Sequence, residues 1–172
     1  MTFTFSRRIS MDTLDPIDHT VVVRDLRPTD LEAVTLLDAK NVGRRRDEFF
    51  KLKLRQALSE TGIAVSLAAE LKGVFVGFLL ARVFYGEFGI TERVAVMDVI
   101  DVHPGFRGHH VAAALMDQLR TNLKGLGIHT LQTEVGWDNT DLLGFFRREG
   151  FVMAQRLCLD LDLEASTELA NQ

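Results

Sequence analysis

The sequence has little cysteine, no excess of positive charge and no long apolar run. Its 172 residues contain a single cysteine, Cys158, which excludes a disulfide framework and a zinc site built from cysteines. The 20 lysines and arginines are outnumbered by 24 aspartates and glutamates, whereas a general nucleic-acid-binding domain would be basic. His103, His109 and His110 lack the spacing of metal ligands. We expect neither a nucleic-acid partner nor a bound metal.

The longest apolar run covers residues 73–83 and is interrupted by glycine. It falls short of the roughly 20 apolar residues that a membrane-spanning helix needs. The N-terminal segment has two arginines after Phe5 but no apolar stretch behind them, unlike a secretory signal. These features predict a cytoplasmic protein without a membrane partner.

The composition, 47% hydrophobic and 26% charged, is that of an ordinary globular protein, and the length predicts one domain. We expect an irregular leader over residues 1–18, a single domain over 19–163 and a frayed tail over 164–172. No internal repeat or linker interrupts the domain.

Hydrophobic periodicity predicts a mixed α/β (α+β) order, β-α-α-β-β-β-α-β-α-β-β. The expected strands cover residues 20–25, 63–71, 74–85, 93–102, 128–135, 151–153 and 157–163. The expected helices cover Thr29 to Gly43, residues 47–59, Gly108 to Gly125 and residues 140–149. A capping box of Thr29 and Glu32 would start the first helix.

Residues 99–112 read as a strand that passes through a short turn directly into a helix. The start of a helix presents unpaired backbone N–H groups and the positive end of the helix dipole, so this turn suits a pyrophosphate. Arg107 adds a permanent positive charge, and Gly108 removes a Cβ where an anion would approach. The simpler alternative is an ordinary strand-to-helix connection with a glycine.

A second segment, residues 134–151, makes the chain resemble the GNAT superfamily of acyl-CoA-dependent N-acetyltransferases. The family pattern V-x-P-x-x-[RQ]-x-x-G-x-[GA] is met by Val102, Pro104, Arg107 and Ala112. The downstream pattern N-x-x-A-x-x-L-Y-x-x-x-G-F is met by Asn139, Gly150 and Phe151. The resemblance implies a mostly antiparallel, splayed sheet flanked by helices, with acetyl-CoA as co-substrate and an amine as acceptor.

The resemblance also implies which residues bind acetyl-CoA. The strand end would pair with the pantetheine arm, the turn and helix start would hold the pyrophosphate, and the second segment would complete the site. The residues in question are Ile100, Asp101, Val102, Arg107, Gly108, His109, His110, Val111, Ala112, Asn139 and Phe146.

The sequence departs from the family pattern at two of these positions. His110 stands where the family usually has glycine, and its imidazole would either meet a phosphate or lie in solvent. Phe146 stands where many members have a tyrosine that protonates the leaving thiolate. A water molecule or the single tyrosine, Tyr85, would have to replace that acid.

Transfer to an amine also needs a base, because an alkylammonium must first lose a proton. Glu134 is the first candidate, since its spacing from Asn139 resembles that of the catalytic glutamate in ribosomal-protein N-terminal acetyltransferases. Asp98 is the second, placed by strand alternation on the same side as Ile100, with Asp101 on the opposite side. Either carboxylate could instead form an ordinary surface ion pair.

Two readings of the function follow from these residues. The first is an N-acetyltransferase that acts on a primary amine of a small molecule or protein; the second is an acyl-CoA-binding module with little catalysis. The run of Arg44, Arg45 and Arg46 could attract an anionic acceptor or lie in solvent. A homodimer is expected only by analogy with the family.

Overall fold

The computed structural model describes residues 20–60, 63–85 and 92–163, apart from the side chains of residues 59 and 60. The chain divides into two compact units, residues 1–134 and 135–172, and each is described by itself. Among the described residues, the first unit holds the sheet and three α-helices, and the second holds one α-helix.

The first unit is built on a five-stranded sheet in the order β1-β2-β3-β4-β5. Its strands are β1 (Val21–Asp25), β2 (Leu67–Leu71), β3 (Val74–Tyr85), β4 (Arg93–Val102) and β5 (Leu131–Thr133). All neighbours are antiparallel except β4 and β5, which run parallel. This confirms the predicted mixed, mostly antiparallel sheet.

The β2–β3 hairpin turns at Lys72 and Gly73, which both have positive φ, 53° and 75°. Positive φ at both central residues is the geometry that matches the right-handed twist of the flanking strands. The hairpin that the sequence predicts at this dipeptide is therefore confirmed.

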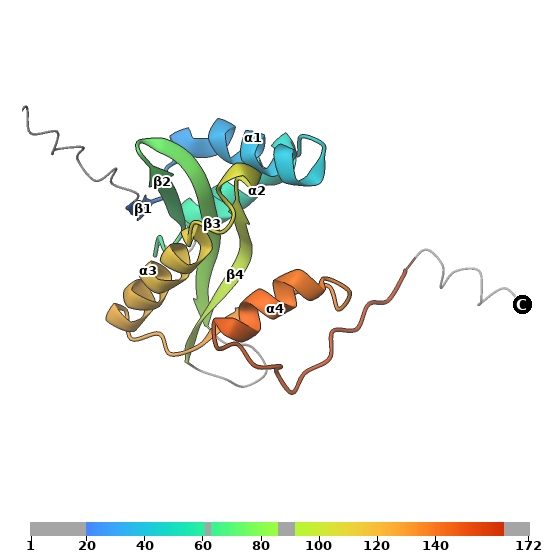
Figure 1. Cartoon of the computed structure of the whole chain (residues 1–172). Coiled ribbons are helices and arrows are strands. Elements are labelled where there is room, and N and C mark those ends of the chain that lie inside the picture. The colour runs from blue at the N-terminus through green and yellow to red at the C-terminus, as the bar shows by residue number, and fades with distance from the viewer. Residues whose placement is uncertain (1–19, 61–62, 86–91, 164–172) are drawn as a thin grey trace, which may run out of the picture. The chain divides into compact units, whose positions relative to one another are not determined.

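Helices cover both faces of the sheet (Figure 1). α1 (Leu31–Val42) and α2 (Asp47–Arg55) pack on one face, and α3 (Val111–Gly125) packs on the other. α2 continues as a π-helical turn over Gln56–Glu60. The core on the α1–α2 face is a cluster of buried apolar side chains: Leu26, Val34, Leu37, Phe50, Leu54, Ala57, Ala68, Phe78 and Leu80.

The start of α1 differs from the prediction. Pro28–Asp30 form a 3₁₀ turn before the helix, and the Asp30 carboxylate accepts the Arg27 N–H at 2.8 Å. Arg24 fixes this carboxylate with two further hydrogen bonds of 2.8 and 3.0 Å. Glu32 is bonded to Arg45 instead of the backbone. The predicted capping box of Thr29 and Glu32 is thus wrong, because a 3₁₀ turn precedes the helix and Asp30 accepts the N–H that caps this turn.

The second unit contains α4 (Thr140–Arg148), which is followed at Gly150 by a residue with φ of 85°. Residues 151–163 form no strand, so the last two strands of the predicted order are wrong. Leu157 and Leu159 are 89% and 87% exposed. Their alternation satisfies the strand pattern, but a strand also needs a neighbouring strand to pair with, and this segment has none among the described residues.

Candidate active site

The last third of β4 has one edge without a neighbouring strand among the described residues. β5 pairs only with Ala95, Val96 and Met97. On the other edge, the His103 N–H donates to Val76 O at 2.8 Å, so the alternate residues Ile100 and Val102 direct their backbone groups away from β3. This is the splay that the family resemblance implies, and it provides a backbone edge to which an extended ligand could add.

A β-bulge in β4 sets which side chains face α1 and α2. Leu80 lies opposite Val99 and Ala81 lies opposite Met97, so Asp98 is an extra residue in the ladder. Asp98 contacts Lys53 of α2, and Asp101 contacts Asn41 of α1. Both carboxylates therefore lie on the α1–α2 face. The prediction that they lie on opposite sides is wrong, because simple alternation does not allow for the bulge.

The turn after β4 leads directly into α3. It contains a short 3₁₀ turn over Pro104–Phe106, then Gly108 with φ of 80° and His110 with φ of 58°. The first helical bond runs from Ala114 N–H to His110 O at 2.9 Å. The N–H groups of the preceding helical residues therefore have no acceptor within the helix, and the positive end of the dipole lies here. This arrangement can bind an anion.

Gly77 of β3 lets the start of α3 approach the sheet closely. A Cβ at this position would lie 2.8 Å from Val111 Cγ1 and 3.1 Å from Asp101 O. Both distances are shorter than ordinary carbon contacts, so any larger residue would push the start of α3 away from β4. Nothing in the periodicity of β3 marks this glycine, so its role could not be predicted from the sequence.

Asn41, near the end of α1, connects β4 to the turn. Its Nδ2 donates to Asp101 Oδ1 at 2.5 Å and to Val102 O at 3.0 Å, while its Oδ1 accepts from Arg107 Nη2 at 2.8 Å. The Val102 N–H donates to Asp101 Oδ1 at 3.0 Å. Asn41 could not be predicted as part of the site from the sequence, because an asparagine in the last turn of a helix carries no signal of its own.

Burial raises the pKa of Asp101 from 3.8 to about 6. The hydrogen bond from the Val102 N–H opposes this effect, the nearby carboxylate of Asp38 adds to it, and Asn41 and Arg107 oppose it. Asp101 is thus a carboxyl group near the open edge that changes protonation state close to neutral pH.

Asp98 is held by two cations. Its Oδ2 lies 3.2 Å from Arg82 Nε and 3.5 Å from Lys53 Nζ, and its side chain is only 14% exposed. Such a carboxylate forms an ion pair that would have to break before it could accept a proton from a substrate.

Glu134 is exposed and follows β5 directly. The last residue of β5, Thr133, bonds through Oγ1 to Met97 O at 3.0 Å, next to the point where β4 and β5 separate. Glu134, the next residue, therefore lies close to the point where β4 and β5 separate. Tyr85 ends β3 and is 75% exposed.

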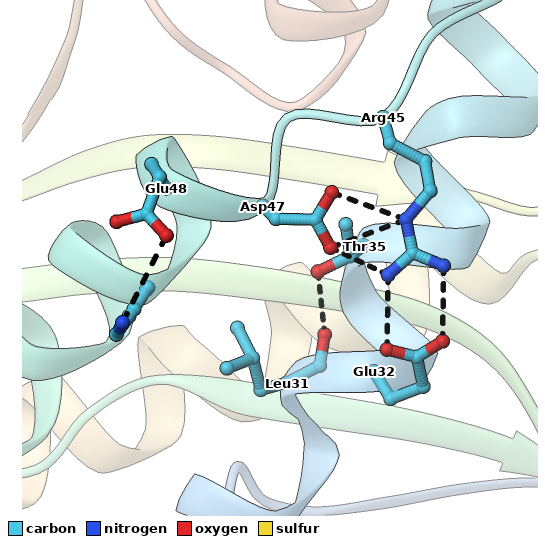
Figure 2. Close-up of polar contacts among 7 residues, drawn as sticks. Leu31, Glu32, Thr35, Arg45, Asp47 and Glu48 are labelled. Carbon is cyan, nitrogen blue, oxygen red and sulfur yellow. Dashed lines mark hydrogen bonds and ion pairs between the residues drawn. The ribbon is translucent and has the colours of Figure 1, made fainter.

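The basic run between α1 and α2 is largely neutralised. The Arg45 guanidinium donates to both Glu32 and Asp47, which lowers the pKa of each carboxyl (Figure 2). Arg46 bonds the buried Asp38 at 2.9 and 2.5 Å. Two of the three arginines thus already have anionic partners, which argues against a free basic patch.

In the second unit, Asn139 caps α4, because its side chain accepts the Leu142 N–H at 3.2 Å. Phe146 is 4% exposed and packs between the rings of Phe145 and Phe151. Trp137 is 89% exposed. Asn139 and Phe146 therefore have clear structural roles within this unit.

Over the described ranges, no three side chains of His, Cys, Asp or Glu converge as metal ligands would. In the same ranges, no helix has the length and apolar character needed to cross a membrane.

The mixed sheet, the splayed β4 edge and the turn into α3 agree with the acetyltransferase fold that the family resemblance implies. The acetyltransferase (GNAT) family model matches residues 31–151, which is more than half of the chain and includes α4. The chain therefore belongs to the GNAT acetyltransferase family, a family of acyltransferases.

Solved structures show the same fold at low sequence identity. An aminoglycoside N-acetyltransferase AAC(6′)-Iy in complex with CoA is 21% identical, with a TM-score of 0.72 over 87% of this chain and 99% of that one. A ribosomal-protein-alanine N-acetyltransferase from Brucella melitensis is 20% identical, with a TM-score of 0.67 over 84% and 100%. Arabidopsis thaliana Naa50, bound to a bisubstrate analogue, is 16% identical, with a TM-score of 0.63 over 78% and 85%.

Proposed function

We propose that the chain is an N-acetyltransferase that passes the acetyl group of acetyl-CoA directly to a primary amine. The observation that carries this proposal is the continuity of an open β4 edge with a helix start that can bind an anion. Acetyl-CoA has the matching chemistry, since an amide-containing arm ends in a pyrophosphate. The structurally similar enzymes crystallised with CoA or CoA analogues support the same cofactor.

In this proposal the cofactor is held mainly by backbone groups. Ile100 would pair with the pantetheine arm, with Asp101 and Val102 beside it, and the turn and helix start over residues 107–112 would hold the pyrophosphate. These turn residues are Arg107, Gly108, His109, His110, Val111 and Ala112. Asn139 and Phe146 stay predicted contacts of the arm, on the strength of the family pattern alone.

The reaction requires a free amine to attack the thioester carbonyl carbon. The carbonyl oxygen takes up negative charge, which a backbone N–H of the β4 edge can stabilise. The tetrahedral intermediate then loses a proton from its nitrogen to solvent or to the base and collapses to the amide with loss of the CoA thiolate. Phe146 has no hydroxyl group, so it cannot protonate this thiolate, and water would have to do so.

We propose Glu134 as the base that deprotonates the amine, with Asp98 as the second candidate. Glu134 is exposed beside the splay, whereas the ion pairs of Asp98 with Lys53 and Arg82 oppose such a role. Glu134→Gln should lower kcat by about 10²- to 10⁴-fold and flatten its pH profile. An unchanged profile would assign the role to another carboxylate.

CoA release, measured over a panel of amines with acetyl-CoA as donor, tests the function itself. The panel should contain aminoglycosides, peptides with free N-termini, lysine-containing peptides and polyamines. Turnover on any of them supports the transferase. Tight binding of acetyl-CoA without turnover would instead support an acyl-CoA-binding module, which the αL strain at His110 and the phenylalanine at position 146 would favour.

A further inference from the structure

Asn41 joins three parts of the first unit that are distant in sequence. Its side chain extends from α1 and bonds Asp101 and Val102 at the end of β4 and Arg107 in the turn, 60 to 66 residues away. The amide group is half-buried, and both its donor and its acceptor ends are used. A surface asparagine without a specific role would not need this complementary set of partners.

The bond from Arg107 fixes a long side chain that would otherwise be mobile. A free arginine side chain has many rotamers, and this freedom is lost when the side chain binds a ligand. Arg107 is exposed, and within the described residues its guanidinium donates one hydrogen bond, from Nη2 to Asn41. Most of its five N–H donors therefore remain available to an anion held at the start of α3.

The same asparagine covers the β4 edge at Val102. The Val102 carbonyl accepts from Asn41, and the Val102 N–H donates to the carboxylate that Asn41 also contacts. These bonds occupy the outward backbone groups of Val102, so an extended ligand arm would pair with β4 at Ile100 and not at Val102. Asn41 thus also affects where such an arm can lie.

We propose that Asn41 is a positioning residue for the cofactor: it holds Arg107 ready for the phosphates of CoA and directs the pantetheine arm to Ile100. This inference rests on the proposed function, because it assumes that CoA is the ligand. Asn41 does not touch the phosphates in this scheme: its effect on them passes through Arg107, and its effect on the arm passes through Val102.

The test is a double-mutant cycle on CoA binding, measured by isothermal titration calorimetry on the full chain. It needs no knowledge of the acceptor. We expect Asn41→Ala to weaken CoA binding about tenfold, because Arg107 must then be ordered by the ligand itself. Arg107→Ala should weaken binding at least as much, and the double variant should bind no worse than Arg107→Ala alone.

Asn122→Ala is the matched control. It removes an asparagine of α3 whose side chain accepts from Gln118 at 2.8 Å, and it should leave CoA binding unchanged. Asn41→Leu fills the volume of the asparagine without its hydrogen bonds, so it gives the same answer if Asn41→Ala folds poorly. Its CoA affinity should also fall about tenfold.

Each outcome separates the inference from the function on which it rests. Wild-type protein that does not bind CoA would overturn both. Wild-type binding together with unchanged affinity in Asn41→Ala and Asn41→Leu, or with additive losses in the double variant, would overturn only the role of Asn41.

Discussion

At the scale of single residues, His110 is the most unusual backbone position near the proposed site. It is a non-glycine residue with φ of 58°, at the position where the family pattern has glycine. A Cβ in this left-handed region costs about 1–2 kcal/mol. The turn keeps its shape with histidine, but the strain lowers the stability of the fold.

His110→Gly should therefore raise the free energy of unfolding by about 0.5–1 kcal/mol, the relieved strain less the greater freedom of glycine in the unfolded chain. His110→Val should lower it by about 1 kcal/mol, because a β-branched residue tolerates positive φ poorly. Urea unfolding of the three proteins measures both changes. A glycine variant less stable than wild type would show that the imidazole makes a stabilising contact.

The pKa of Asp101 predicts a pH-dependent stability. Burial raises this pKa from 3.8 to about 6, so the folded state binds a proton more tightly than the unfolded state. The carboxyl group must lose that proton as the pH rises from about 4 to above 6, and folding stability falls over this window.

Asp101→Asn removes this dependence but keeps an oxygen that accepts from Val102 and Asn41. The stability of the variant relative to wild type should rise by about 1–2 kcal/mol between pH 4.5 and pH 7.5. Urea unfolding of both proteins at the two pH values measures this difference. A constant difference would mean that Asp101 has an ordinary pKa.

The position of the turn between β4 and α3 could be predicted from the sequence because it depends on chain order. Arg107, Gly108 and the start of α3 follow β4 directly, as the motif implied. The contacts of Asp98, Asp101 and Asn41 could not be predicted in this way. A bulge of one residue changes the phase of β4, and the partner of Asp101 lies 60 residues earlier in the chain.

At the scale of elements, the packing of α3 on β3 positions the turn that is proposed to bind the phosphates of CoA. Gly77→Ala would place a Cβ 2.8 Å from Val111 Cγ1, in a part of the core where Val111 and Leu115 are buried. We expect a loss of about 1–3 kcal/mol in stability, as is typical of overpacking, together with weaker CoA binding.

Val111→Ala removes the clashing Cγ1, so the double variant should lose less stability than the sum of the two single variants. Gly125→Ala is the control, because nothing lies within 4 Å of its added Cβ. Thermal unfolding and CoA titration measure both effects. Strictly additive losses would contradict a clash between the added methyl group and the Val111 side chain as the cause.

The elements themselves could be predicted where periodicity agrees with a partner surface. α1, α2 and α3 each bury an apolar face against the sheet, and their positions match the expected ones. Residues 157–163 have the alternation of a strand but no paired neighbour among the described residues, and the expected strand is absent there. A strand depends on a second segment, so its own sequence is not sufficient to predict it.

At the scale of the whole molecule, the net charge of −4 does not describe the surface, because several charged side chains are paired with opposite charges. Arg45, Arg46 and Arg24 are each bonded to carboxylates, and Asp98 is bonded to two cations. The overall charge therefore does not indicate the charge of the acceptor. The exposed Arg107 at the turn keeps donors for an anion, which in the proposed function is a phosphate of CoA and not the acceptor.

Binding of CoA should stabilise the whole fold by mass action. At a CoA concentration of one hundred times Kd, the gain is about 2.7 kcal/mol, which for a chain of this size raises Tm by about 5–10 °C. Differential scanning fluorimetry over a series of CoA concentrations measures the shift. Arg107→Ala should show a smaller shift at every concentration, while Arg156→Ala, an exposed arginine outside the proposed site, should match wild type. Equal shifts in all three proteins would place the bound CoA away from the start of α3.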